Sequence, residues 1–197
     1  MADRSDVVQE SLLASVRSCA ICTGLPLGPK PLFQASPDAR ILIAGQAPGR
    51  RAHESGIPFR DPSGDRLRKW LGVDDDAFYD ATRIAILPMG FCYPGTGKRG
   101  DLPPRPECAD AWRQRMLATM PAIRLTILIG MYAQRWHLGE ACGPTVTDNV
   151  SRWRQFWPEL MPLPHPSPRN AAWLGRHPEI ESELLPALRS RVADVLR

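Results

Sequence analysis

Four short apolar runs alternate along the chain with segments whose apolar residues have helical spacing. The runs cover 39–45, 83–90, 125–130 and 159–164, and glycine or proline closes each of them. Continuous apolar runs of this length are typical of parallel strands buried on both faces. The pattern therefore predicts a four-stranded, mainly parallel sheet.

Helical spacing is found between and around these runs, in the segments 8–18, 64–71, 106–119, 131–138, 147–156 and 179–196. In the last segment one apolar stripe is predicted to belong to the core: Leu184, Leu185, Leu188, Val192 and Leu196. Strands that alternate with helices indicate an α/β protein with three layers, α/β/α, in a single domain over 1–197. Prolines gathered in 94–106 and 158–168 predict stiff loops there.

Composition indicates the size of the core, the cellular compartment and the kind of partner, but it does not identify a reaction. Of 197 residues, 43% are hydrophobic and 23% are charged, which is enough apolar surface for one sizeable core. The sequence has no run of eighteen apolar residues, and its acidic N-terminal stretch lacks the features of a signal peptide, so we expect a cytoplasmic protein with no membrane contact. The net charge of +4 suits an anionic partner such as nucleic acid, and equally a solvated surface excess.

Each predicted strand leads into an unusual loop. The loops begin with GQAPG after the first run, GFCYPGTG after the second, GMYAQ after the third and HPSPRN after the fourth. Because the carboxyl ends of parallel strands meet at one edge, and open α/β sheets bind ligands there, we expect these loops to form a site.

Two of these loops resemble a known family. GQAPG at 45–49 followed by HPSPRN at 165–170 resembles the paired motifs of the uracil-DNA glycosylase superfamily, whose members flip a base out of DNA and cut its N-glycosidic bond. The stretch 45–72 is similar to family 4 enzymes of bacteria and archaea, and the second motif is similar to the single-strand-selective branch. The resemblance runs from Cys19 to Asn170. It implies a monomeric DNA repair enzyme that hydrolyses the bond to uracil or a related deaminated base.

The second motif contains the candidate for leaving-group stabilisation. Cleavage of the glycosidic bond leaves negative charge on the base, so a hydrogen-bond donor near the base oxygen lowers the barrier. His165, held between prolines, is that candidate. The resemblance puts Gln46 and Ala47 beneath the base, where efficient family members have a carboxylate, so Gln46 and His53 are the further catalytic candidates. An exposed surface histidine is the alternative interpretation of His53.

Base recognition is expected from Phe59, which the resemblance places against the flipped base, although a core phenylalanine is the alternative. Pro88 stands where family 4 enzymes have the asparagine that reads uracil, which predicts relaxed selectivity. Asn170 or Gln46 could take over that contact.

Contacts with the DNA backbone are expected from Ser167 and Arg169 in the second motif, with Asn170 filling the gap left by the flipped base. Lys98 and Arg99, in the loop after the second strand, are further candidates, and a solvated loop is the alternative there.

The cysteines add a candidate metal centre. Cys19, Cys22, Cys92 and Cys108 resemble the four-cysteine pattern of family 4, which carries a [4Fe-4S] cluster. From the residues alone, four thiolates could hold that cluster or a structural zinc, or they could be unconnected reduced thiols. Two other functions stay open as well: a catalytically poor member that binds or traps uracil-containing DNA, and a metal-bound nucleic-acid-binding module without chemistry.

Overall fold

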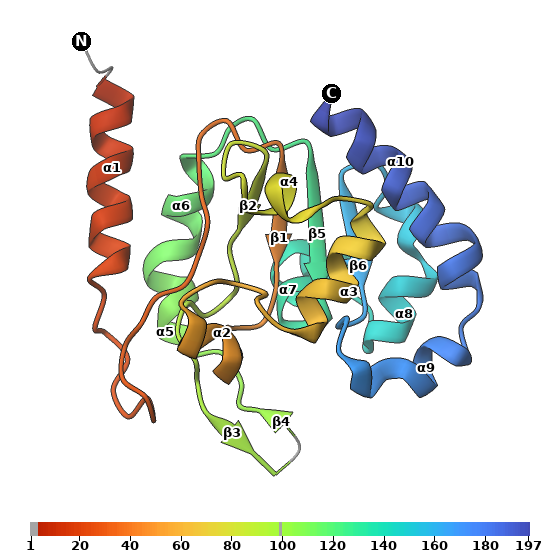
Figure 1. Cartoon of the computed structure of the whole chain (residues 1–197), viewed down its shortest axis with the longest axis horizontal. Helices are drawn as coiled ribbons and strands as arrows, with labels where there is room; N and C mark the ends of the chain where they lie inside the picture. The colour runs from red at the N-terminus through yellow and green to blue at the C-terminus, as the bar shows by residue number, and fades with distance from the viewer. Residues whose placement is uncertain (1–3, 99) are drawn as a thin grey trace.

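A four-stranded parallel sheet forms the centre of the computed structural model, which describes residues 4–98 and 100–197 (Figure 1). Its strands are β1 (Ile41–Ala44), β2 (Ile84–Ile86), β5 (Leu125–Ile129) and β6 (Leu160–Leu163), in the order β2-β1-β5-β6. All three strand pairs are parallel. The α/β class and the parallel sheet predicted from the sequence are confirmed.

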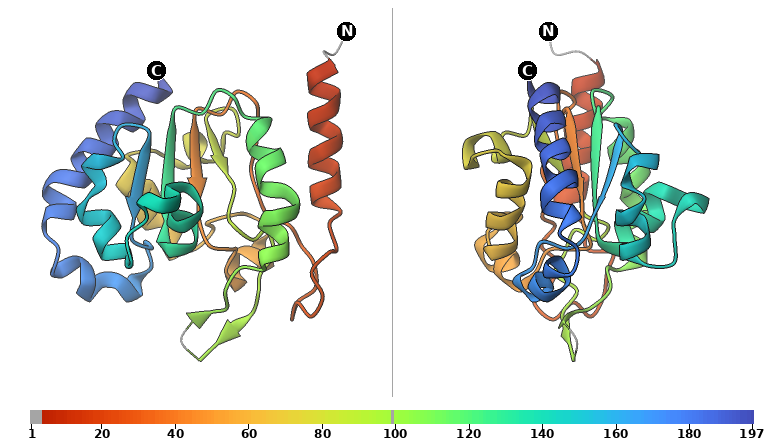
Figure 2. Two further views of the ribbon diagram at one scale, coloured as in Figure 1. Left: turned by 180° about the vertical axis from the view of Figure 1, so that it is seen from behind. Right: turned by 90° about the vertical axis from the view of Figure 1, so that its right-hand side faces the viewer.

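Helices cover both faces of this sheet, so there are three layers (Figure 2). Ile41 and Ile43 point into a core shared with α3 (Pro62–Leu71) and α10 (Leu185–Leu196). Leu42, between them, points to the opposite face, where it packs with α1 (Arg4–Arg17) and α6 (Gln114–Ala118). Burial on both faces explains why the strands have continuous apolar runs.

The remaining helices are α2 (Arg50–Ser55), α4 (Asp75–Tyr79), α5 (Pro106–Cys108), α7 (Gly130–Leu138), α8 (Val146–Ser151) and α9 (Ala171–Gly175). Short 3-10 turns are η2 (Gly139–Ala141), η3 (Trp153–Gln155) and η4 (Pro168–Asn170), and π-helical turns are η1 (Ala109–Arg113) and η5 (Ile180–Leu184). None of the described helices has the length and apolarity needed to span a bilayer.

The structure departs from the sequence prediction in its short elements. The helices α2, α4 and α9 were not expected, and each has only five or six residues. The loop 94–106 contains a small antiparallel hairpin of β3 (Thr96–Gly97) and β4 (Gly100–Asp101), which projects below the sheet (Figure 1). Such short segments complete too few periods to be read from a hydrophobic pattern.

Candidate active site

A cavity of about 450 Å³ opens at the carboxyl edge of the sheet. We call it the edge cavity. Each strand of the central sheet ends at or leads into its wall: Gly45 follows β1, Pro88 follows β2, Ile129 ends β5 and His165 follows β6. This volume suits a small ligand or a single flipped nucleotide. Two of the loops that the sequence singled out, GQAPG and HPSPRN, thus meet at one place, whereas no residue of GMYAQ or GFCYPGTG is part of the wall that the described residues form.

Seven of the predicted site residues line the edge cavity: Gln46, Ala47, Phe59, His165, Ser167, Arg169 and Asn170. The side-chain amides of two of them are already engaged with backbone. Gln46 Nε2 donates to the Leu102 carbonyl at 2.9 Å. Asn170 Nδ2 donates to the His165 carbonyl at 2.8 Å. Both amides therefore brace the loops around the cavity.

The geometry of His165 fixes which ring nitrogen carries the proton. The Ser167 backbone N–H donates to His165 Nδ1 at 3.1 Å, so Nδ1 is an acceptor and a neutral ring carries its proton on Nε2. The ring lines the edge cavity, and His165 is exposed there. Partial desolvation by the protein around the ring lowers the pKa of His165, and the charges of Asp61 and Asp101 oppose the shift. The imidazole is thus set up as a neutral donor at neutral pH.

Two carboxylates that the sequence analysis missed, Asp61 and Asp101, line the same cavity. Asp61 is the N-cap of α3, and its side chain accepts the Gly64 N–H at 2.9 Å. Asp101 lies in β4 of the small hairpin. Asp61 left a signal in the sequence, because the DPSG stretch is typical of a helix start. Asp101 left none, since its approach depends on the fold of the hairpin.

Phe59 has an unusual backbone conformation at the cavity wall. Its φ is 55°, in the left-handed region that few residues other than glycine adopt. Its carbonyl accepts hydrogen bonds from Tyr79 Oη at 3.3 Å and from Arg68 Nη1 at 3.4 Å. The ring meets Phe78 edge-on at 6.2 Å between centroids. Phe59 is therefore half-buried, with part of its surface against the core and part facing the cavity.

Two of the predicted residues that the structure describes, His53 and Lys98, are not part of the cavity wall. His53 is buried in α2 with 8% of its surface exposed, so the interpretation as an exposed histidine is wrong; its surroundings lower its pKa, mainly by desolvation. The described lining does not include His53, although its neighbour Ala52 belongs to it. Lys98 is exposed at the hairpin turn. Arg99 lies outside the described residues.

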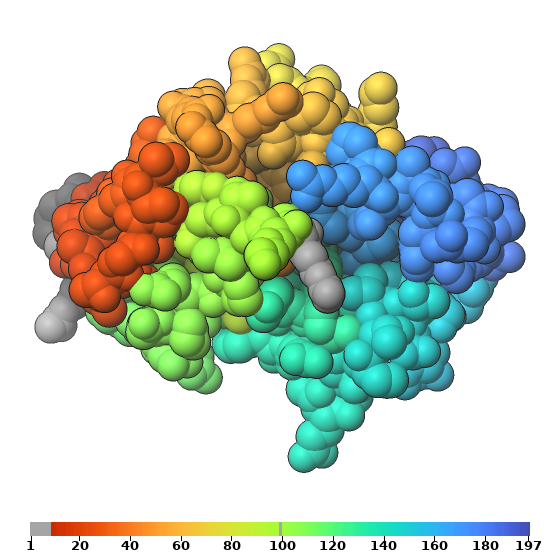
Figure 3. Space-filling model, turned by 90° about the horizontal axis from the view of Figure 1, so that it is seen from below, coloured from red at the N-terminus to blue at the C-terminus, as the bar shows by residue number. Residues whose placement is uncertain are grey.

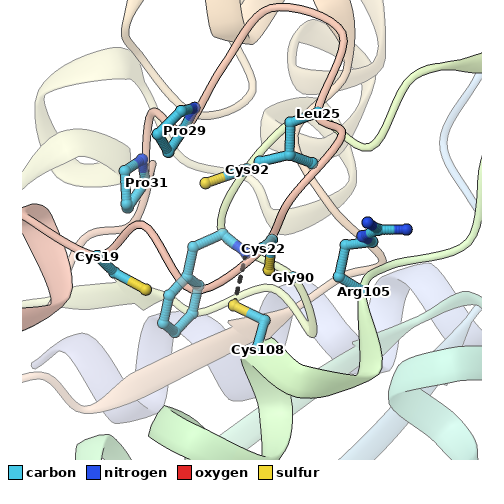
Figure 4. Close-up of a pocket in the computed structure, with 10 residues that line it drawn as sticks. Cys19, Cys22, Leu25, Pro29, Pro31, Gly90, Cys92, Arg105 and Cys108 are labelled. Carbon is cyan, nitrogen blue, oxygen red and sulfur yellow. Dashed lines mark hydrogen bonds between the residues drawn. The ribbon is translucent and has the colours of Figure 1, made fainter.

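A second, much smaller cavity is lined by Cys19, Cys22, Cys92 and Cys108 (Figure 4). We call it the cysteine cavity. Burial raises the pKa of Cys108 to about 12, and the other three thiols add to that rise. Two N–H groups point at sulfur atoms: the Phe91 backbone N–H is 3.3 Å from Cys108 Sγ, and Trp112 Nε1 is 3.2 Å from Cys19 Sγ. Among the described residues no three His, Cys, Asp or Glu side chains form a ready-made metal site.

The two motifs that line the edge cavity lie in a region that matches a known protein family. Residues 33–189 match the model of the uracil DNA glycosylase superfamily, and this range includes both motifs and the whole central sheet. A candidate uracil DNA glycosylase from Methanosarcina acetivorans, solved by solution NMR, is 17% identical; the match covers 81% of this chain and 97% of that chain, with a TM-score of 0.43. Members of the matched superfamily are DNA glycosylases. The chain belongs to the uracil DNA glycosylase superfamily.

Proposed function

We propose that this protein removes uracil or a related deaminated base from DNA by hydrolysing the N-glycosidic bond. One observation carries the proposal: both motifs of the superfamily line a single cavity, with the Nε2–H of His165 available to a ligand inside it. In this proposal the protein is a cytoplasmic monomer that acts as one domain, and its partner is DNA containing a damaged base.

The residues divide the work as follows. Phe59 stacks on the flipped base, whose ring is apolar on both faces. As the C1'–N bond lengthens, the departing base gains negative charge, and His165 donates a hydrogen bond to its oxygen. A neutral donor suits this step, because the charge that it stabilises develops only in the transition state. Ser167 and Arg169 lie at the same wall, where they can hold the phosphates that flank the flipped nucleotide.

The base is selected by shape more than by a complete set of hydrogen bonds. Pro88 lines the cavity and offers no side-chain donor or acceptor. Gln46 and Asn170 each have one amide hydrogen engaged with a backbone carbonyl, so only their remaining polar atoms can contact a base. We therefore propose a pocket that accepts several deaminated bases.

The decisive experiment uses a labelled single-stranded oligonucleotide with one uracil, incubated with the protein and then heated in alkali. Denaturing electrophoresis separates three results. Cleavage at the uracil supports the glycosylase, a slow-migrating adduct supports a member that traps DNA, and intact, unmodified substrate supports a binding module without chemistry. Oligonucleotides with xanthine, hypoxanthine or 5-substituted uracil extend the same test to selectivity.

We also propose that the four cysteines hold a [4Fe-4S] cluster, with zinc as the alternative. The fit rests on the donor set: four thiols from distant segments line one cavity, and two N–H groups point at their sulfurs. Sulfur ligands suit both centres, and N–H donors stabilise thiolates. Bound there, the centre would link the N-terminal segment to the loop after β2. The thiols would have to turn inward and lose their protons, since they form no ready-made site.

Anaerobic purification followed by metal analysis tests this second proposal. About four irons and a brown colour support the cluster. One zinc and a colourless protein support the alternative. A protein free of both metals would overturn both.

A further inference from the structure

The proposed reaction leaves a need that the first motif does not meet. Departure of the base leaves positive charge on the sugar, and the water that attacks the sugar must lose a proton. A nearby carboxylate can stabilise the positive sugar and accept the proton of the water, yet GQAPG contains no carboxylate. Asp61 and Asp101 are the carboxylates that line the edge cavity among the described residues. This inference rests on the proposed glycosylase function and asks which of the two supplies the charge.

Asp61 is already engaged in the structure of α3. Its Oδ1 accepts the Gly64 N–H at 2.9 Å and caps the first turn of the helix. The positive end of the helix dipole lies at the same place and stabilises its negative charge. Asp61 is therefore already committed to holding the start of the helix.

Asp101 is oriented by neutral groups instead. The Thr96 hydroxyl donates to Asp101 Oδ1 at 3.2 Å, and Thr96 Oγ1 is 2.5 Å from the Tyr93 hydroxyl. A hydroxyl has a single proton, so Thr96 gives its proton to Asp101 while Tyr93 gives its own to Thr96. The chain fixes one carboxylate oxygen without neutralising it. No salt bridge to Asp101 is found among the described side chains.

The other oxygen of Asp101 reaches the first motif. A Cβ atom at Gly49 would lie 3.4 Å from Asp101 Oδ2. That separation is an ordinary van der Waals contact, which locates Oδ2 next to the backbone of the first motif. Oδ2 therefore sits beside GQAPG, where the motif itself has no carboxylate.

The hairpin lies close to both motifs, and a hydrogen bond joins it to the first. On one side Gln46 Nε2 donates to the Leu102 carbonyl, next to Asp101. On the other side Gly100 approaches the second motif, and a Cβ atom on it would be 3.2 Å from Arg169 Nη1. Figure 3 shows the hairpin, in yellow-green, wedged between the neighbouring loops on this face. The fold thus brings a residue from outside both motifs to the point where they meet.

We propose that Asp101 is the catalytic carboxylate of this protein. When the C1'–N bond breaks, its electron pair leaves with the base, and Asp101 Oδ2 faces the cationic sugar. Water then forms the new C1'–O bond and passes a proton to Asp101, which later releases it to solvent. The departed base anion takes up one proton from solvent, so the sum is hydrolysis. Thr96 and Tyr93 act as positioning residues.

The test compares two matched variants, Asp101→Asn and Asp61→Asn, in single-turnover cleavage of the best base found for the wild type. Each removes one negative charge from the cavity without a change of shape, and asparagine still caps α3. Loss of a positioned general base typically costs about 10²- to 10⁴-fold in rate. We expect that loss for Asp101→Asn with unchanged DNA affinity, and a loss of only a few-fold for Asp61→Asn. Thr96→Val should fall between them.

A second readout does not depend on turnover. The charged side chains near the His165 ring are Asp61 and Asp101, together with Arg169 at the cavity wall and Arg66, which donates to the Ser167 carbonyl. Asp101 favours the protonated ring, so Asp101→Asn should lower the pKa of His165 when the ring is titrated by NMR in DNA-free protein. His165→Ala assigns the signal.

Two results would overturn the assignment while the proposed function stands: near wild-type cleavage by Asp101→Asn, or an equal or greater loss in Asp61→Asn. An unchanged His165 titration in Asp101→Asn would also count against it, because Oδ2 would then not face the cavity. If the wild type itself cleaves no base, the proposed function fails, and the role of Asp101 fails with it.

Discussion

At the scale of single residues, His165 is the side chain whose removal is most informative. With Nδ1 occupied by the Ser167 N–H, the ring can offer only Nε2–H to the base. Loss of one well-placed donor to a developing anion typically costs about 10²- to 10³-fold in rate. We expect His165→Ala to show that loss in single-turnover kinetics while DNA affinity, measured by anisotropy, stays the same. His177→Ala is the matched control, since His177 pairs with Glu179 away from the cavity. A rate within a few-fold of wild type would contradict the assignment.

The pH dependence follows from the same residue. Desolvation lowers the pKa of His165 below its ordinary value near 6.5, although Asp61 and Asp101 oppose this. The active form is the neutral ring, and a lowered pKa keeps the ring neutral to lower pH. The cleavage rate should therefore remain on its plateau at about pH 6.5, where an ordinary histidine is half protonated, and fall only in more acidic buffer. An acid limb centred at or above that pH would show that desolvation does not control the ring.

Phe59 carries the corresponding prediction for binding. Stacking on an aromatic ring contributes roughly 1 to 3 kcal/mol per base and tolerates different bases. Phe59→Ala should therefore weaken binding of uracil, deaminated purines and 5-substituted uracils by similar factors. Tyr132→Ala, at an exposed aromatic residue on α7, is the control. If the wild type strongly preferred uracil, the proposal that the edge cavity selects bases by shape would be wrong.

At the scale of elements, α3 supports the strained conformation of Phe59. A Cβ atom on Gly64 would lie 1.8 Å from the Phe59 carbonyl oxygen, so the start of this helix can approach Phe59 only at a glycine. Gly64→Ala must displace one of the two backbones, and overpacking typically costs about 1 to 3 kcal/mol. Urea unfolding should show at least this loss, together with weaker substrate binding.

Gly175→Ala provides the matched control for the helix. Gly175 is in α9, and a Cβ atom there meets nothing within 4 Å. This variant should keep its stability or gain a little, because alanine has the higher helix propensity. Equal stability of Gly64→Ala and Gly175→Ala would show that the start of α3 has room for a side chain next to the Phe59 carbonyl.

The same scale shows what the sequence could and could not predict. The sheet was readable because each strand is buried on both faces, and the edge cavity followed from the direction of the strands. The position of Asp101 was not readable. It depends on a hairpin with two residues in each strand, too short for a periodic pattern, and on a chain of hydroxyl groups from Tyr93 through Thr96. Phe59 could be predicted to line the site, but its positive φ could not, and neither could the hydrogen bonds from Arg68 and Tyr79 to its carbonyl, because these contacts form only in the folded chain.

At the scale of the whole molecule, the cysteine cavity and the edge cavity are connected through the segment after β2. Cys108 is followed directly by η1, whose Arg113 is fully buried. Arg113 Nη1 donates to the carbonyls of Leu87 at 2.9 Å and Pro88 at 3.1 Å, and Pro88 lines the edge cavity. A structural change at Cys108 can therefore reach the edge cavity through η1 and the hydrogen bonds of Arg113.

This connection gives a prediction for removal of the metal. The proposed centre would join segments far apart in sequence, and a cross-link of that kind typically stabilises a fold by about 2 to 4 kcal/mol. Cys108→Ser should lose the metal and about that much stability in urea. Hydrogen exchange should rise at Leu32, whose N–H donates to the Phe91 carbonyl at 2.7 Å beside the cysteine cavity, while Ile127 in the central strand stays protected.

The control is Cys142→Ser, since Cys142 lies outside the cysteine cavity. It should keep both the metal and the exchange pattern of the wild type. Because Arg113 ties η1 to Pro88, Cys108→Ser should also weaken base binding more than it slows the chemical step proposed for His165. An equal loss in both parameters would mean that removal of the metal unfolds the site as a whole, and an unchanged protein would mean that the four thiols hold no metal.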